Sequence, residues 1–125
     1  MSRHRNDHRK LGRTSEHRQA LMRNLVVSLI EHGRIKTTIP KAKEARRYAE
    51  KCITLAKKAL AATEPSQALH YRRLAMSALH NKAAVKRLVD EIAPTYKDRQ
   101  GGYTRIMRAG FRLGDHGEIA LFELV

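Results

Sequence analysis

The chain has 125 residues, which is the usual size of one folded domain and too short for a two-domain enzyme. It carries 26 lysines and arginines against 12 acidic residues, so its formal net charge is +14 and its pI is about 10.6. A hydrophobic content of 42% supports a folded core and excludes a chain that is disordered throughout. So large a positive charge indicates an acidic partner, and nucleic acid is the partner that a pI above about 9 most often indicates.

Membrane and secreted proteins fit this sequence poorly. The longest uncharged apolar stretch, residues 24–30, is far shorter than the roughly 20 residues that cross a bilayer. The basic N-terminus lacks the apolar segment of a secretory signal and the amphipathic periodicity of a mitochondrial transit peptide. Cys52 is the only cysteine, which excludes an internal disulfide or a multi-cysteine zinc site and fits a reducing compartment. We therefore expect a cytoplasmic protein with no membrane partner.

Residues 1–13 form a separate segment by composition. They hold five basic residues and one acidic residue, and Leu11 is the only large apolar side chain after Met1. Such a segment buries too little apolar surface to offset the entropy of ordering it. We predict an extended arm, mobile alone and ordered on a polyanion, with residues 14–125 as the globular domain. A merely solvated tail is the alternative.

A first helix is predicted from Thr14 or Ser15, either of which can cap it, to the stop signal at Gly33. Its apolar residues recur four positions apart and form one wide buried face: Leu21, Met22, Leu25, Val26, Leu29 and Ile30. The β-branched run Ile35–Ile39 then predicts a short strand, bounded by Gly33 and Pro40.

A second helix is predicted from Pro40 to about Leu60, with two opposite faces. The apolar face contains Ala45, Ala49, Cys52, Ile53, Ala56 and Leu60. The other face carries a stripe of cations, namely Lys43, Arg47, Lys51 and Lys58, which Glu44 and Glu50 neutralise only in part. The stripe is either an RNA-facing surface or a solvated helix face, and Cys52 is interpreted as a core residue.

The linker at residues 63–66 precedes a predicted third helix over Gln67–Leu79. Asn81 can cap a fourth helix over Lys82–Ala93, with Pro94 beyond its end and an apolar face of Ala84, Val85, Leu88, Val89 and Ile92. Two strands, Tyr103–Ala109 and Glu118–Val125, follow around a loop that contains Gly110, Gly114 and Gly117. Residues 101–125 have three arginines and three acids, so their net charge is zero.

No pattern of catalytic or metal-binding residues is evident. His4, His8 and His17 lie in or near the arm, which lacks the helical pattern that would fix ligands four residues apart, and the neighbouring arginines would repel a divalent cation. No phosphate-binding glycine loop and no nucleophile motif is present. Six aromatic residues are too few for a platform that stacks single-stranded bases. We expect no enzyme activity, no cofactor, no metal and no small-molecule substrate, and binding to folded RNA through its phosphates and shape.

Three blocks of sequence carry a resemblance to a known family. The first is residues 17–25, the second runs over residues 35–44 and 53–57, and the third comprises residues 101–106, Arg112, Gly114, Asp115 and residues 123–125. In this order and spacing the chain closely resembles the bacterial large-subunit ribosomal protein L-seventeen family. The resemblance implies an α+β fold, with about four helices packed on a small three-stranded, mostly antiparallel sheet. It also implies a structural constituent of the large subunit, without catalytic activity, that binds 23S ribosomal RNA near the peptide exit tunnel beside other ribosomal proteins.

We expect four groups of residues to contact RNA. They are the arm residues Arg3, His4, Arg5, Arg9, Lys10 and Arg13; the first-helix residues His17, Arg18 and Arg23; Lys36 with the second-helix residues Lys43, Arg47 and Lys51; and Tyr103, Arg105, Arg108 and Arg112 near the C-terminus. A free-standing nucleoid or regulatory protein that binds nucleic acid is the alternative function. A membrane-surface protein fits less well, because its basic helix would be backed by large apolar residues rather than by alanine.

Overall fold

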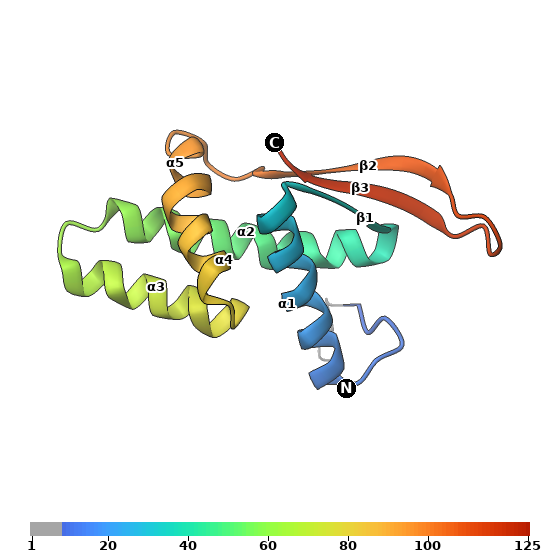
Figure 1. Cartoon of the computed structure of the whole chain (residues 1–125), viewed down its shortest axis with the longest axis horizontal. Helices are drawn as coiled ribbons and strands as arrows, with labels where there is room; N and C mark the ends of the chain where they lie inside the picture. The colour runs from blue at the N-terminus through green and yellow to red at the C-terminus, as the bar shows by residue number, and fades with distance from the viewer. Residues whose placement is uncertain (1–8) are drawn as a thin grey trace, which may run out of the picture.

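A computed structural model shows an α+β fold and describes residues 9–125 (Figure 1). In chain order the elements are α1 (Ser15–His32), β1 (Arg34–Thr38), α2 (Ile39–Ala61), α3 (Pro65–Leu79), α4 (Lys82–Arg87), η1 (Leu88–Ile92), α5 (Ala93–Thr95), β2 (Thr104–Phe111) and β3 (Glu118–Leu124). The long helix α2 runs through the middle of the molecule. The sheet covers one half of α2 and α3 lies along the other half, while α1 crosses it (Figure 1).

The two ends of α1 are where the sequence predicts them. The backbone N–H of His17 donates to the Thr14 hydroxyl at 3.3 Å, and Gly33 ends the helix in the left-handed region at φ 74°. The buried side chains of α1 are Met22, Val26, Leu29 and Ile30. Leu21 and Leu25, which complete the predicted face, are only half-buried at the edge of the core.

The apolar face of α2 is confirmed over most of its length. Ala45, Ala49, Cys52, Ile53 and Ala56 are all buried. The small alanine side chains allow the neighbouring elements to approach the α2 backbone closely. The prediction for Leu60 is wrong, because this side chain is 46% exposed. It borders an open hollow beside Pro94 and Lys97 instead of meeting a packed neighbour.

Two predicted helix boundaries are also wrong. The third helix begins at Pro65, two residues before Gln67, because proline has the right φ and no N–H to lose in a first helical turn. The fourth helix does not stop before Pro94, since a π-turn and a short α5 continue the same rod to Thr95. In the π-turn the N–H of Ala93 donates to the carbonyl of Leu88. A proline at residue 94 crowds the carbonyl four residues earlier, which accounts for the departure from α geometry just before it.

The three-stranded sheet has the order β1–β3–β2, and both pairings are antiparallel. Ala120 and Phe122 of the central strand are fully buried and face the helices. The strand β2 continues two residues past the predicted end at Ala109, to Phe111. Its register shifts between Arg108 and Phe111, where Gly110 adopts φ +100°, so the glycine forms a bulge within the strand rather than opening the loop.

The core lies where α1, α2, α3, η1 and β3 meet. Its largest fully buried side chains are Met22, Leu29, Ile53, Leu79, Leu88 and Phe122. The core is therefore mainly aliphatic, as the low aromatic content predicts. Among residues 9–125, no helix is long and apolar enough to cross a membrane.

Candidate nucleic-acid interface

The predicted cationic stripe of α2 lies on the solvent side of the helix. Lys43, Arg47, Lys51 and Lys58 are all exposed, and the core covers the opposite face. Along a helix a rise of 1.5 Å per residue places the first three of these cations roughly 6 Å apart. The stripe therefore has the position and the spacing of a surface that can follow a chain of phosphates.

The two acidic residues next to this stripe are engaged within the domain. Glu44 is only 1% exposed, and its carboxylate lies 3.7 Å from Nη1 of Arg47. The carboxylate of Glu50 accepts hydrogen bonds from the backbone N–H groups of Tyr103 and Thr104, at 3.3 and 3.2 Å, and from the Thr104 hydroxyl at 3.0 Å. Lys43 and Lys51 have no acidic partner among residues 9–125. The charges of Lys43 and Lys51 are thus available to an external partner, whereas Arg47 is paired with Glu44.

An open hollow joins the start of α2 to β2. Its volume is about 340 Å³, and it is lined by Ile39, Lys43, Arg46, Ile106 and Arg108. The fold thus brings Lys43 and Arg108, which are 65 positions apart in the sequence, to one concave surface. Arg46 is not evident as a contact from the sequence, because on a helical wheel it falls close to the apolar face. Only the position of β2 over the helix shows that it joins this group.

The part of the arm that the structure describes turns back onto the body. Arg13 donates from its backbone N–H to the carbonyl of Lys10 at 3.1 Å and from Nη1 to that of Leu11 at 2.7 Å. Leu11 packs against the core, and Nη1 of Arg9 lies 3.8 Å from the buried carboxylate of Glu44. Residues 10–13 therefore form a turn docked on the domain rather than an extended chain. The predicted contacts Arg3, His4 and Arg5 lie outside the described residues.

The predicted contacts on α1 differ in their exposure. His17 is exposed, whereas Arg18 and Arg23 are half-buried. The Nε atoms of both arginines are buried and have no hydrogen-bond partner among the residues that the structure describes. Arg23 borders a hollow of about 230 Å³ that Tyr48 and Cys52 also line, so its aliphatic stem packs between helices.

The outer face of the sheet holds a three-residue ion cluster. The register aligns Arg34 of β1, Glu123 of β3 and Arg105 of β2 in one row. Each arginine donates from Nε to the Glu123 carboxylate at 2.8 Å, and these two guanidinium groups hold the pKa of Glu123 below its usual range. Lys36 is exposed two residues along the same face. Sequence analysis missed Arg34, whose partner is distant in the chain.

Tyr103 lies inside the molecule. Its side chain is 3% exposed and packs on Tyr96, with 5.1 Å between the ring centres. Lys57 donates to its hydroxyl at 2.8 Å, and this hydrogen bond lowers the pKa of Tyr103. The structure thus gives Tyr103 a packing role at the start of β2, and contact between Tyr103 and RNA stays a prediction.

The remaining predicted arginines pair with acids of their own hairpin. Arg108 donates to Glu118 at 2.8 Å, and Arg112 donates to Asp115 at 2.7 Å. Together with Arg105, all three arginines after residue 100 have an acidic partner. The charges of Arg108 and Arg112 are therefore matched before any external partner binds, whereas Arg105 shares the single charge of Glu123 with Arg34.

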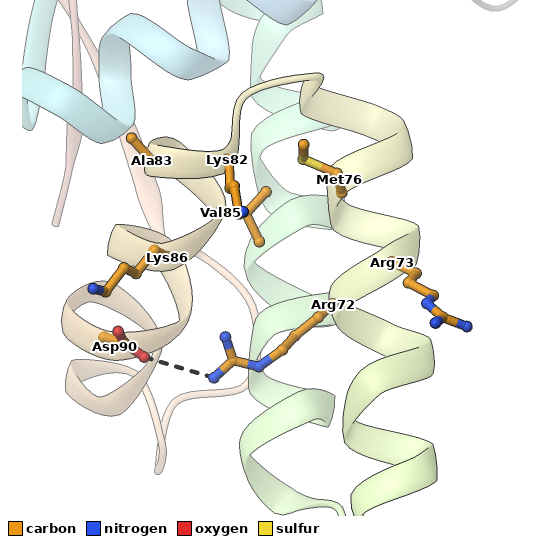
Figure 2. A pocket seen from close by; sticks show the side chains of 8 residues that line it. All are labelled: Arg72, Arg73, Met76, Lys82, Ala83, Val85, Lys86 and Asp90. Atoms are coloured by element: carbon orange, nitrogen blue, oxygen red, sulfur yellow. Dashed lines mark ion pairs between the residues drawn. The ribbon is translucent and has the colours of Figure 1, made fainter.

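A second basic surface lies between α3 and α4, where no contact was predicted. An open hollow of about 850 Å³ is lined by the basic residues Arg72, Arg73, Lys82 and Lys86 together with Met76 and Val85. Figure 2 shows these side chains on the two neighbouring helices. Arg72 reaches across the hollow to Asp90, at 3.6 Å. The basic side chains come from two helices, and only their packing gathers them.

The chemistry available is the binding of anions. Burial raises the pKa of Cys52 to about 11, so its thiol stays protonated at neutral pH and is a poor nucleophile. Within residues 9–125 the structure groups no three histidine, cysteine or acidic side chains that could hold a metal ion. Unpaired lysines and arginines on convex and hollowed surfaces can neutralise phosphates and follow the shape of a folded polyanion.

Comparison with known proteins identifies the family. The model of the family described as Ribosomal protein L17 matches residues 21–125. The chain belongs to this family. Large ribosomal subunit protein bL17 of Sulfurimonas denitrificans is 54% identical over 123 residues, which cover 98% of this chain and 99% of the relative. The bL17 protein of Nautilia profundicola is 50% identical, over 98% of this chain and 98% of its own length. That of Alkaliphilus metalliredigens is 54% identical, over 94% of this chain and 96% of its own length. The family resemblance in the sequence is confirmed.

Proposed function

We propose that this protein is a structural constituent of the large ribosomal subunit, and that it binds 23S ribosomal RNA near the peptide exit tunnel. Membership of the ribosomal protein L17 family carries this proposal, because relatives that match almost the whole chain are large-subunit proteins by name. Proteins of this family are structural components and not enzymes. In this proposal the partners are ribosomal RNA and neighbouring ribosomal proteins, and the protein works in the cytoplasm.

The main RNA surface in this proposal is the solvent face of α2. Residues 41–58 hold seven basic and two acidic residues, and both acids are engaged within the domain. Lys43, Arg46 and Lys51 are exposed and have no ionic partner in the part of the chain that the structure describes. Lys36, on the outer face of the sheet, and the α1 residues His17, Arg18 and Arg23 are further RNA contacts in this proposal. In this proposal residues 1–13 also contact RNA, and the turn at residues 10–13 is docked on the domain before RNA binds.

Sedimentation of a cell extract tests the assignment to the ribosome. We expect the protein in large subunits at one copy per particle, measured by mass spectrometry of gradient fractions, and retained after a wash in moderate salt. A free-standing nucleic-acid-binding protein would instead leave the particles under gentle salt and bind DNA and RNA alike. Recovery mainly in the free fractions would exclude the ribosomal role.

Charge removal on α2 tests the RNA surface. We expect the triple variant Lys43→Gln, Arg46→Gln, Lys51→Gln to bind a 23S RNA fragment more weakly and with a smaller salt dependence. Each lost phosphate contact lowers the slope of log affinity against log salt by roughly 0.7 to 0.9. With six or more contacts, the affinity of the unmodified protein should fall on the order of 10³-fold between 50 and 200 mM salt.

The matched control for this experiment is the double variant Arg112→Gln, Asp115→Asn. It removes one cation together with its own partner, so the net charge does not change. Circular dichroism and thermal melting check that all variants fold. Equal RNA affinity and an equal salt slope in the α2 variant and the unmodified protein would exclude α2 as the RNA surface.

A further inference from the structure

The hairpin of β2 and β3 ends in a tip that exposes large apolar side chains. Leu113 is wholly exposed, and Phe111 is 63% exposed on the adjacent end of β2. Met107, further down the same strand, is 37% exposed. Figure 1 shows the hairpin extending past the helices, so no described element covers this tip. A cluster of exposed apolar side chains on an ordered loop is typical of an interaction surface.

The tip is held in one conformation by its own contacts. The backbone N–H of Arg112 donates to the carbonyl of Gly117 at 2.8 Å, and that of His116 donates to the carbonyl of Arg112 at 3.2 Å. The carboxylate of Asp115 accepts from the Arg112 side chain and, at 3.0 Å, from the N–H of Gly117. Leu113 is thus presented to solvent by an ordered turn, and a partner that bound it would lose little loop entropy.

The charge of the hairpin distinguishes a protein partner from RNA. The chain as a whole carries +14, but residues 101–125 carry three arginines and three acids. Arg108 and Arg112, the arginines nearest the tip, already bind Glu118 and Asp115. A phosphate would have to displace these carboxylates and lie beside them, whereas Lys43 and Lys51 on α2 are unopposed among residues 9–125. A neutral tip with an apolar end suits an apolar cleft better than a phosphate backbone.

We propose that the hairpin tip is a protein-docking finger, in which Phe111 and Leu113 insert into an apolar cleft on a neighbouring protein of the large subunit. This proposal rests on the ribosomal function proposed above. It divides the molecule into an RNA-binding side on α2 and a protein-binding end at the hairpin. The internal hydrogen bonds of residues 112–117 position the two apolar side chains before docking.

Site-specific photocrosslinking in purified large subunits tests the partner directly. The photoreactive residue p-benzoylphenylalanine replaces Leu113 in one full-length chain and Lys51 in another. We expect the probe at residue 113 to give an adduct with one large-subunit protein and the probe at residue 51 to give an adduct with RNA. An RNA adduct at residue 113 would overturn the proposal, and so would the absence of any adduct there when residue 51 crosslinks. Absence of both chains from the particles would instead contradict the ribosomal function.

A second experiment separates docking at the tip from RNA binding. The variant Phe111→Ser, Leu113→Ser should bind protein-free 23S RNA with unchanged affinity and salt slope. Its retention in complete subunits during a salt wash should fall about tenfold or more, the usual effect of losing an apolar anchor. Unchanged retention, or an equal loss of affinity for protein-free RNA, would contradict protein docking.

Discussion

Glu123 is a buried carboxylate that depends on two arginines from different strands. It is 4% exposed on the central strand, near the end of that strand, with Arg34 on one side and Arg105 on the other. A buried carboxylate is costly unless it is paired and hydrogen-bonded, and the two guanidinium groups meet both conditions. Because β3 is the central strand, this single side chain links both edge strands to it.

The lowered pKa of Glu123 predicts acid-sensitive stability. Since the pKa in the folded state lies below the ordinary value of 4.5, the ionised carboxylate stabilises the fold at pH values above 4.5. This contribution is lost as the pH falls through the folded-state pKa. We expect Glu123→Gln to lower the free energy of unfolding at pH 7, with the difference from the unmodified protein shrinking below pH 4.5, as measured by urea denaturation. Glu118→Gln, which breaks a more exposed pair, is the control, and a pH-independent difference for Glu123→Gln would contradict the prediction.

Two leucines give a direct test of which apolar side chains support the fold. Leu29 is fully buried and Leu113 is fully exposed. We expect Leu29→Ala to lower the free energy of unfolding by about 2–5 kcal/mol, because it leaves a cavity in the core. Leu113→Ala should change it by less than about 0.5 kcal/mol. A large loss of stability in Leu113→Ala, measured by thermal or urea denaturation, would show that the hairpin tip has a structural role instead of a docking role.

At the scale of elements, α1 and α3 end in the same backbone geometry with different residues. Gly33 ends α1 at φ 74°, and His80 ends α3 at φ 52°. Both N–H groups donate to the carbonyl four residues earlier, at 2.7 and 2.8 Å. Glycine adopts this left-handed conformation at no steric cost, whereas a residue with a Cβ is strained there.

Exchange of the two capping residue types should therefore have opposite effects. We expect Gly33→Ala to destabilise the protein by about 1–2 kcal/mol. No atom lies within 4 Å of the added methyl group, so this effect is conformational. His80→Gly should be neutral or stabilising by up to about 1 kcal/mol, because it removes the same strain. Urea denaturation of the two variants measures both changes in the free energy of unfolding. If His80→Gly destabilised the protein, a contact of the His80 side chain would outweigh the strain of its backbone.

Helix faces could be predicted because periodicity alone sets them. Cys52 and Ile53 are buried where the 3.6-residue repeat of α2 places them. The same repeat cannot show where packing stops, so Leu60 was assigned to a core that ends before it. It also cannot show that Glu44 is buried, because the burial of that side chain depends on more than its own helix. The π-turn before Pro94 and the bulge at Gly110 are local departures from regular geometry, which a regular repeat does not reveal.

The candidate site could be predicted as a list of cations but not as a surface. Lys43, Arg47 and Lys51 were found because they recur along one helix face. The pairing of Arg105 with Glu123 and the burial of Tyr103 result from contacts across the sheet and across the core. Such contacts join residues that are distant in the chain, so sequence spacing does not reveal which cations are already neutralised.

At the scale of the whole molecule, the unpaired cations of α2 lie away from Phe111 and Leu113, the two most exposed of the large apolar side chains. The solvent face of α2 has unpaired cations, and the open hollow between α3 and α4 adds a second basic surface (Figure 2). The hairpin end is neutral and presents Phe111 and Leu113. A domain with this distribution can bind a polyanion along one side and a protein at one end without competition between the two.

The arm should add to RNA binding without adding to the fold. A chain that begins at Arg9 lacks Arg3 and Arg5 but keeps every core residue that the structure describes. We expect its melting temperature to stay close to that of the full chain. Its salt slope for RNA binding should fall by roughly 1 to 2, because two phosphate contacts are lost. An unchanged slope would show that the first eight residues do not contact phosphates.

The strand order also has a consequence for the time at which the molecule can fold. The central strand β3 is the last of the three strands, and β1, which precedes it by about 80 residues, pairs with no other strand among residues 9–125. During synthesis β1 and β2 therefore stay unpaired until residues 118–124 have emerged from the translating ribosome. Pairings across such separations are slow to form. Only a chain translated through β3 can close its sheet, so a nascent chain interrupted before that point cannot reach the shape that a ribosome would incorporate.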